Sequence, residues 1–250
     1  MTSVTGRINE VKQPYGGYLP IRNMTVETYD DGEVLNEKEN IAPTLVGLTV
    51  DYLTRVVLGE NEYEAFEISF RGLSIAERLN MRIETKPTFI PNDLSDESII
   101  NAVILANYDS IYRAGPIFYR EPELPDKQTI ENIRRMVLRS EKFFKDVYPV
   151  TQFGFTFEGG YTDTITAGDG DFLTKDGLWD MKVIRGRFTA RHSLQLLIYW
   201  RMGLHSKYDY FKNVQKLGFF NPRKNQSTMI DVSDISKDVI QEVEKNVIGY

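Results

Sequence analysis

Two carboxylates and a lysine lie close together around a predicted tight turn. Asp171 precedes the turn at Asp176-Gly177, and Asp180 and Lys182 follow it. Asp-Gly between two apolar runs is a strong hairpin signal, because both residues tolerate positive φ. Residues two apart share one face of a strand, so a two-residue turn places all three charged side chains on one face, with Asp171 opposite Lys182. A turn one residue longer or shorter would separate them.

The chemistry expected of this set is metal-assisted hydrolysis of a phosphate ester. Carboxylate oxygens suit Mg²⁺ or Mn²⁺, which keep waters and substrate phosphates among their ligands. A bound ion of this kind can generate a hydroxide-like nucleophile, and Lys182 could position the attacking water or hold a phosphate oxygen. The alternative for these three residues alone is an ordinary Asp–Lys pair on a solvated hairpin.

A predicted helix follows the hairpin and carries two further polar residues. Gln195 and Tyr199 are four residues apart, so they share one face of a helix, and Arg191 extends the same stripe. The opposite face is apolar, so the alternative is that these are boundary residues of an amphipathic helix.

The order of the whole set resembles the PD-(D/E)XK nuclease superfamily, most closely its RecB-like exonuclease branch. That branch reads Gly-x-x-Asp, then Asp-x-Lys, then Gln-x-x-x-Tyr, and Gly168 to Asp171, Asp180-Met181-Lys182 and Gln195 to Tyr199 fit the three motifs. The resemblance covers about residues 150–224. It implies a restriction-endonuclease-like core, with Asp171, Asp180 and the Met181 carbonyl as metal ligands, Lys182 as the catalytic lysine, and Gln195 and Tyr199 supporting the site and the nucleic-acid backbone.

The superfamily often takes one more acid from a helix ahead of the sheet. A helix predicted from about Asn40 or Pro43 to Leu58 contains Asp51, at the place where the RecB-like branch has a histidine. Asp51 is therefore the expected third metal ligand, with Glu77 as the other candidate. Either residue could instead be a surface charge.

The charge distribution favours a nucleic-acid partner, although the net charge of −6 does not. The segment 182–224 contains ten Lys or Arg and one acid, a net charge of +9, and aromatic residues interleave it. Such a block is typical of a surface that binds a phosphate backbone. Arg185, Arg187 and Arg191 are the expected nucleic-acid contacts, and DNA is the expected substrate. The alternative is a solvated basic face that answers the acidic N-terminal half.

The remaining patterns predict one α+β domain of this 250-residue chain. Residues 1–42 are expected to form an irregular arm, 43–149 a helical part, and 150–250 a mixed-sheet nuclease core packed on the helical part. The chain has no cysteine, no apolar signal-peptide core and no apolar run of membrane-spanning length, which predicts a cytoplasmic protein without membrane contact. The only two histidines, His192 and His205, match no zinc pair, and no phosphate-binding loop motif is present.

Three functions are consistent with these features. The first is a metal-dependent nuclease, and the Gln195 and Tyr199 motif favours an exonuclease over an endonuclease. The second is a catalytically inactive nuclease-fold protein that binds nucleic acid or a protein partner. The third is an enzyme that uses Asp171 and Asp180 as an acid–base pair, such as a glycosidase. Lys182 and the basic block argue against the third.

Overall fold

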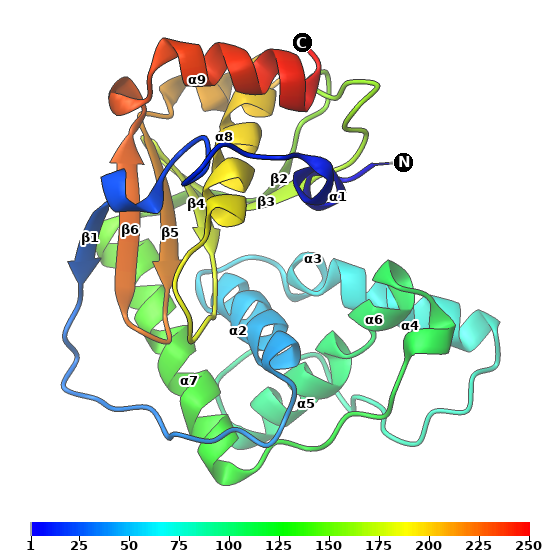
Figure 1. Cartoon of the computed structure of the whole chain (residues 1–250). Helices are drawn as coiled ribbons and strands as arrows, with labels where there is room; N and C mark the ends of the chain where they lie inside the picture. The colour runs from blue at the N-terminus through cyan, green and yellow to red at the C-terminus, as the bar shows by residue number, and fades with distance from the viewer. Residues whose placement is uncertain (1) are drawn as a thin grey trace. The chain divides into compact units, whose positions relative to one another are not determined.

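The computed structural model describes residues 2–250, and its internal contacts divide the chain into two compact units (Figure 1). Unit 1 comprises residues 2–29 and 146–250, and unit 2 comprises residues 30–145. Unit 1 holds a mixed six-stranded sheet with helices, whereas unit 2 is helical. The predicted α+β class is confirmed.

The sheet of unit 1 has the strand order β1-β6-β5-β4-β3-β2. Only the central β4–β5 pair among these strands is parallel, and the other four pairs are antiparallel. A parallel pair needs a crossover connection, which here contains helix α8. The strands are β1 (Thr25–Thr28), β2 (Val150–Thr156), β3 (Asp169–Thr174), β4 (Gly177–Met181), β5 (Lys216–Asn221) and β6 (Gln226–Asp231).

Helix α8 (Ala190–His205) contacts β4 and β5 and is central to the apolar core of unit 1. Leu194, Leu197 and Ile198 are fully buried in that core, as the helical periodicity requires. Near the C-terminus, α9 (Lys237–Glu242) continues as the π turn η6 (Val243–Ile248), which also contacts α8. The hydrogen-bonding pattern of this last helical segment thus changes from α to π after Glu242.

The N-terminal segment is not the irregular arm that the sequence predicts. Ser3 caps a short helix α1 (Val4–Glu10), which packs against α8, and the Arg7 guanidinium donates to the carbonyls of Asn246 and Val247 at 2.8 Å each. Further on, β1 forms the edge of the sheet beside β6. These contacts are between residues far apart in the sequence, so local turn signals do not reveal them.

Unit 2 contains the helix expected from Asn40 or Pro43 to Leu58, which the structure has from Pro43 to Val57. Residues 62–78 form two helices, and so do residues 96–113. Pro43 occupies the first turn of α2, and Asp126 accepts the Thr129 backbone N–H at the start of α7, both typical helix starts. The helices are α2 (Pro43–Val57), α3 (Glu62–Ala65), α4 (Glu67–Arg78), α5 (Asp96–Ala106), α6 (Asp109–Arg113) and α7 (Lys127–Lys142), which runs into the π turn η3 (Phe143–Val147).

Candidate functional site

The β3–β4 hairpin brings Asp171 and Asp180 face to face. Its register pairs Phe172 with Trp179 and Leu173 with Leu178, so the next pair outward sets Asp171 opposite Asp180. The predicted register, with Asp171 opposite Lys182, is wrong by two residues. Because side chains alternate with a period of two, this shift leaves both carboxylates and Lys182 on the predicted face and brings the carboxylates closer together.

The turn itself is at Lys175-Asp176 rather than at Asp176-Gly177. Gly177 is the first residue of β4, and a Cβ placed on it would lie 2.5 Å from the indole nitrogen of Trp179. The glycine is therefore required by the close approach of the Trp179 ring, and it is not in the left-handed backbone conformation that the predicted turn needs. This is the physical reason for the two-residue register error.

Asp180 is the most deeply buried charge of the site. The residue is 1% exposed to solvent. Lys182 Nζ lies 2.9 Å from each of its carboxylate oxygens. The Lys182 side chain retains 25% exposure. A buried carboxylate is costly unless it is paired, and here the compensating ammonium lies two residues along the chain and extends toward solvent.

Asp171 is held by the backbone of the neighbouring strand. Its Oδ2 accepts the Met181 N–H at 2.8 Å, while the next residue, Lys182, donates its own N–H to the Phe220 carbonyl of β5 at 3.0 Å. The Asp171 carboxylate is thereby oriented toward the end of β4, beside Asp180. A fixed carboxylate loses less conformational entropy when it binds a ligand, which suits a metal-binding or acid–base role.

Helix α8 places Gln195 and Tyr199 next to these charges. Gln195 Nε2 donates to Tyr199 Oη at 2.7 Å, which confirms the predicted shared face. Tyr199 is 5% exposed; burial, followed by the negative charge of Asp180, raises the pKa of its phenol. Asp169 and Asp171 also contribute to this shift, so the phenol lies within electrostatic reach of the hairpin carboxylates.

The structure also brings His192, which the sequence patterns did not select, to this region. His192 lies one turn ahead of Gln195 on α8, and its Nδ1 accepts the Thr189 backbone N–H at 3.1 Å. Burial lowers the pKa of its imidazole, and the positive charge of Lys182 lowers it further. The sequence does contain a signal for His192. It precedes Gln195 by three residues and Tyr199 by seven, a spacing that places all three on one face of a helix.

The predicted nucleic-acid contacts lie on the exposed surface around the start of α8. Arg185 and Arg187 are in the loop between β4 and α8, and Arg191 is in the first turn of the helix. The β5–β6 turn holds this loop, because Asn221 Nδ2 donates to the Ile184 carbonyl at 2.8 Å and Lys224 donates to the Gly186 carbonyl. Several other cations of the 182–224 block are paired with acids, so the positive surface is narrower than the sequence count implies. These pairs are Lys207–Glu158, Lys212–Asp209, Lys216–Asp176 and Arg201–Glu244.

The two candidates for a third acid both lie in unit 2. Asp51 is on α2 and pairs with Arg55 at 3.3 Å. Near it, burial raises the pKa of Glu60 to about 7, and the charge of Asp51 adds to the shift. Since Asp51 belongs to the other unit, its role as a metal ligand stays a prediction, and Glu60 is a perturbed carboxyl that the sequence did not reveal.

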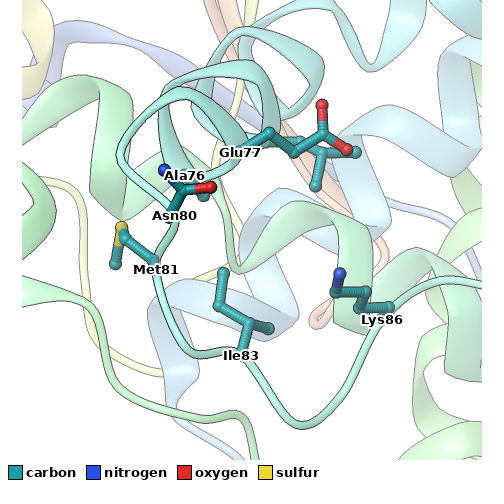
Figure 2. A pocket seen from close by; sticks show the side chains of 7 residues that line it. Ala76, Glu77, Asn80, Met81, Ile83 and Lys86 are labelled. Atoms are coloured by element: carbon teal, nitrogen blue, oxygen red, sulfur yellow. The ribbon is translucent and has the colours of Figure 1, made fainter.

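Glu77, the other candidate, is exposed on α4 and lines a pocket of about 340 Å³ within unit 2. Figure 2 shows its carboxylate among the lining side chains, together with the ammonium of Lys86. The remaining lining residues are Leu73, Ala76, Asn80, Met81 and Ile83.

The donor set of the hairpin fits a hard divalent cation that keeps water among its ligands. Two carboxylates on adjacent strands offer oxygen ligands only, which suits Mg²⁺ or Mn²⁺ rather than zinc. Within residues 2–250, no group of three or more acidic or histidine side chains is arranged to hold a metal ion. The two carboxylates could supply part of a coordination shell, and water and phosphate oxygens would supply the rest.

Comparison with known proteins adds no relative: no protein-family model, no curated protein and no solved structure matches this chain. Among the helices that the structure describes, none combines the length and the apolar character needed to cross a membrane.

Proposed function

We propose that this protein is a metal-dependent nuclease that hydrolyses phosphodiester bonds, with DNA as its substrate and exonucleolytic cleavage as its mode. The observation that carries the proposal is the convergence of Asp171, Asp180 and Lys182 at the open end of the β3–β4 hairpin. An ordinary surface ion pair would not need a carboxylate buried to 1% exposure opposite a second carboxylate.

Each residue of the hairpin has a role that follows from its environment. Asp171 and Asp180 would hold Mg²⁺ or Mn²⁺, which when bound acidifies water and stabilises charge on the phosphoryl group. Lys182 can rotate its partly exposed ammonium from Asp180 toward a phosphate oxygen or an attacking water. Gln195 and Tyr199 restrict each other through their hydrogen bond and would orient the backbone of the strand being cleaved.

The order of the elements supports a restriction-endonuclease-like core of the RecB-like type. Strands β2, β3 and β4 are antiparallel neighbours, α8 follows, and β5 returns parallel to β4. The three motifs of that branch fall on β3, β4 and α8 in the expected sequence. The preference for exonuclease activity rests on the Gln195 and Tyr199 motif.

The test is degradation of labelled linear and circular DNA, single- and double-stranded, with Mg²⁺, Mn²⁺ or EDTA. We expect metal-dependent loss of linear DNA, with circular DNA resistant, and a fall of at least about 10³-fold in Asp180→Ala and Lys182→Ala, since each removes a group that acts on the reacting phosphate. The matched control is the Asp176–Lys216 ion pair, 3.1 Å apart, which joins the β3–β4 turn to the first residue of β5 at the far end of the hairpin. Asp176→Ala and Lys216→Ala should cleave like the unmodified protein.

The second candidate is a nuclease-fold protein that binds nucleic acid without turnover, and the exposed Arg185, Arg187 and Arg191 around the start of α8 suit such binding. Its signature would be no cleavage by the folded protein, together with binding that weakens steeply as salt rises. In that case Arg187→Gln should lower the slope of log affinity against log salt by about 0.9, whereas Lys237→Gln on α9 should not. Cleavage that survives EDTA would contradict both candidates.

A further inference from the structure

His192 is a partly exposed histidine that uses one ring nitrogen at the start of α8, and no hydrogen bond to Nε2 is present among the described residues. Its Nδ1 accepts the Thr189 N–H, as the third residue of a helix does in a capping box, and this contact fixes the ring orientation. Because Nδ1 is the acceptor, the proton of the neutral imidazole is on Nε2. The ring is partly exposed, so Nε2–H is a donor that the helix start holds in place.

The surroundings of the ring connect it to the hairpin. The imidazole packs edge-on against Phe188 and Phe219, with centroid distances of 5.9 and 6.2 Å, and these two phenyl rings stack at 4.4 Å. Phe219 is the β5 residue paired with Asp180 in the parallel ladder. The lowered pKa of His192, caused by burial and by Lys182, means that the ring is neutral near pH 7.

We infer that His192 is a substrate-binding residue of this site, donating its Nε2–H to a non-bridging oxygen of the phosphodiester next to Lys182. The inference rests on the proposed function and names the group bound there. A neutral donor beside an ammonium binds a phosphate oxygen without adding a second positive charge to the buried pair formed by Asp180 and Lys182. Hydrogen bonds to charged groups are among the stronger ones in proteins.

Two isosteric substitutions separate this role from helix capping. In His192→Asn the side-chain oxygen can replace Nδ1 as the acceptor for Thr189, but nothing replaces Nε2. In His192→Gln the amide nitrogen can replace Nε2, and the amide oxygen can accept the Thr189 N–H, as a glutamine at the third helical position does in a capping box. If Nε2 binds the substrate, His192→Asn should lower kcat/KM by about 10- to 100-fold, mainly by raising KM, and His192→Gln should retain most of the activity.

The matched control is His205, the other histidine of the chain, at the opposite end of α8. It stacks on Tyr250 at 3.8 Å and lies 3.3 Å from a Glu244 oxygen. His205→Gln should therefore leave kcat/KM unchanged. Retention of activity in His192→Asn, with or without a loss in His192→Gln, would overturn the inference and leave His192 as a helix cap.

A second readout does not depend on turnover. With only two histidines, ¹⁵N-imidazole NMR resolves both rings, and a phosphorothioate oligodeoxynucleotide with Ca²⁺ serves as the probe. We expect the His192 Nε2 resonance to shift on titration and the His205 resonances to stay. If both His192 variants lose activity, the NMR titration distinguishes the two roles. An unchanged His192 Nε2 resonance would then overturn the inference. Failure of the proposed nuclease is recognised separately, by wild-type protein that does not cleave.

Discussion

Asp109 in unit 2 and Asp180 in unit 1 are buried to the same extent, 1% exposed, but their carboxylates are stabilised in different ways. Asp109 accepts hydrogen bonds from the Ser69 hydroxyl at 2.5 Å and from the Tyr52 hydroxyl, with Arg113 Nε at 3.5 Å. Asp180 is compensated by the ammonium of Lys182.

The difference between the two carboxylates indicates two purposes. The donors of Asp109 come from α2, α4 and α6, so the carboxylate ties three helices together and is closed to ligands. The partner of Asp180 lies two residues further along the chain, just past the end of β4, so the ion pair joins no separate elements, and the partly exposed Lys182 side chain extends to solvent. We interpret Asp109 as structural, whereas Asp180 has the environment that the proposed function requires.

The largest expected effects come from the isosteric pair Asp109→Asn and Asp180→Asn. Asp180→Asn should abolish cleavage, by at least about 10³-fold, and change the free energy of unfolding by no more than about 1 kcal/mol. Asp109→Asn should leave cleavage by the folded protein intact and cost roughly 2 kcal/mol, because its NH₂ group cannot accept from both hydroxyls.

The two units need separate probes in that experiment. Both tryptophans, Trp179 and Trp200, lie in unit 1, so their fluorescence follows its urea unfolding, while amide hydrogen exchange follows the helices of unit 2. The comparison fails if the substitution at Asp180 proves as destabilising as the one at Asp109, or if the Asp109 variant loses activity while still folded.

A smaller effect is expected from removing one hydroxyl in each region. Tyr52→Phe deletes a donor to Asp109 and should cost about 1–2 kcal/mol in unit 2, with cleavage unchanged. Tyr199→Phe removes the acceptor of Gln195 Nε2 and should cost less than about 1 kcal/mol, while cleavage falls about tenfold because Gln195 is no longer oriented.

The pH dependence gives Tyr52→Phe a second test. Burial raises the pKa of Asp109, so its contribution to stability is present at low pH and is lost as pH rises through the raised pKa of the folded state. The Tyr52 hydrogen bond opposes that shift. In Tyr52→Phe the loss of stability should therefore extend to higher pH, as measured by urea unfolding at several pH values; an identical pH profile for the variant and the unmodified protein would contradict the assigned network.

The sequence predicts which side chains share a face of the hairpin better than it predicts the strand register. Side chains alternate with a period of two, so a register error of two residues leaves Asp171, Asp180 and Lys182 on the same face. The register depends on whether Gly177 is a turn residue or a packing residue. The packing of the Trp179 ring against Gly177 determines the register, and the position of that ring depends on the tertiary structure.

Other features depend on contacts between distant segments and have no local signal. The edge strand β1 pairs with β6 about 200 residues away, and Arg7 binds carbonyls at Asn246 and Val247. Likewise, Asp109 reads as an ordinary charge in the sequence, and its burial becomes evident only when α2, α4 and α6 pack. The pair Gln195 and Tyr199 was predictable because a helix spacing of four is local.

Glu60, just after the end of α2, is a third carboxyl for this comparison, is only partly buried, and gives the smallest expected effect. Its Oε2 is buried and has no hydrogen-bond partner among the described residues. Burial raises its pKa from 4.5 to about 7, with Arg55 opposing the shift and Asp51 and Glu64 adding to it. Unlike Asp109 it lacks hydroxyl donors, and unlike Asp180 it lacks an adjacent lysine, so its ionised form should be a net cost.

The sign of that cost can be measured with Glu60→Gln. Between about pH 4.5 and 7 the folded state holds a proton that the unfolded state has released, so stability falls as pH rises through this window. Glu60→Gln should remove this fall and stabilise unit 2 by about 1 kcal/mol at pH 8, a value reduced for partial solvent screening, with little change at pH 4.5. Hydrogen exchange of α2 at the two pH values measures it, with Glu62→Gln on α3 as the control. Destabilisation at pH 8 would instead mean that ionised Glu60 is held by favourable contacts, as a carboxylate poised to bind a cation would be.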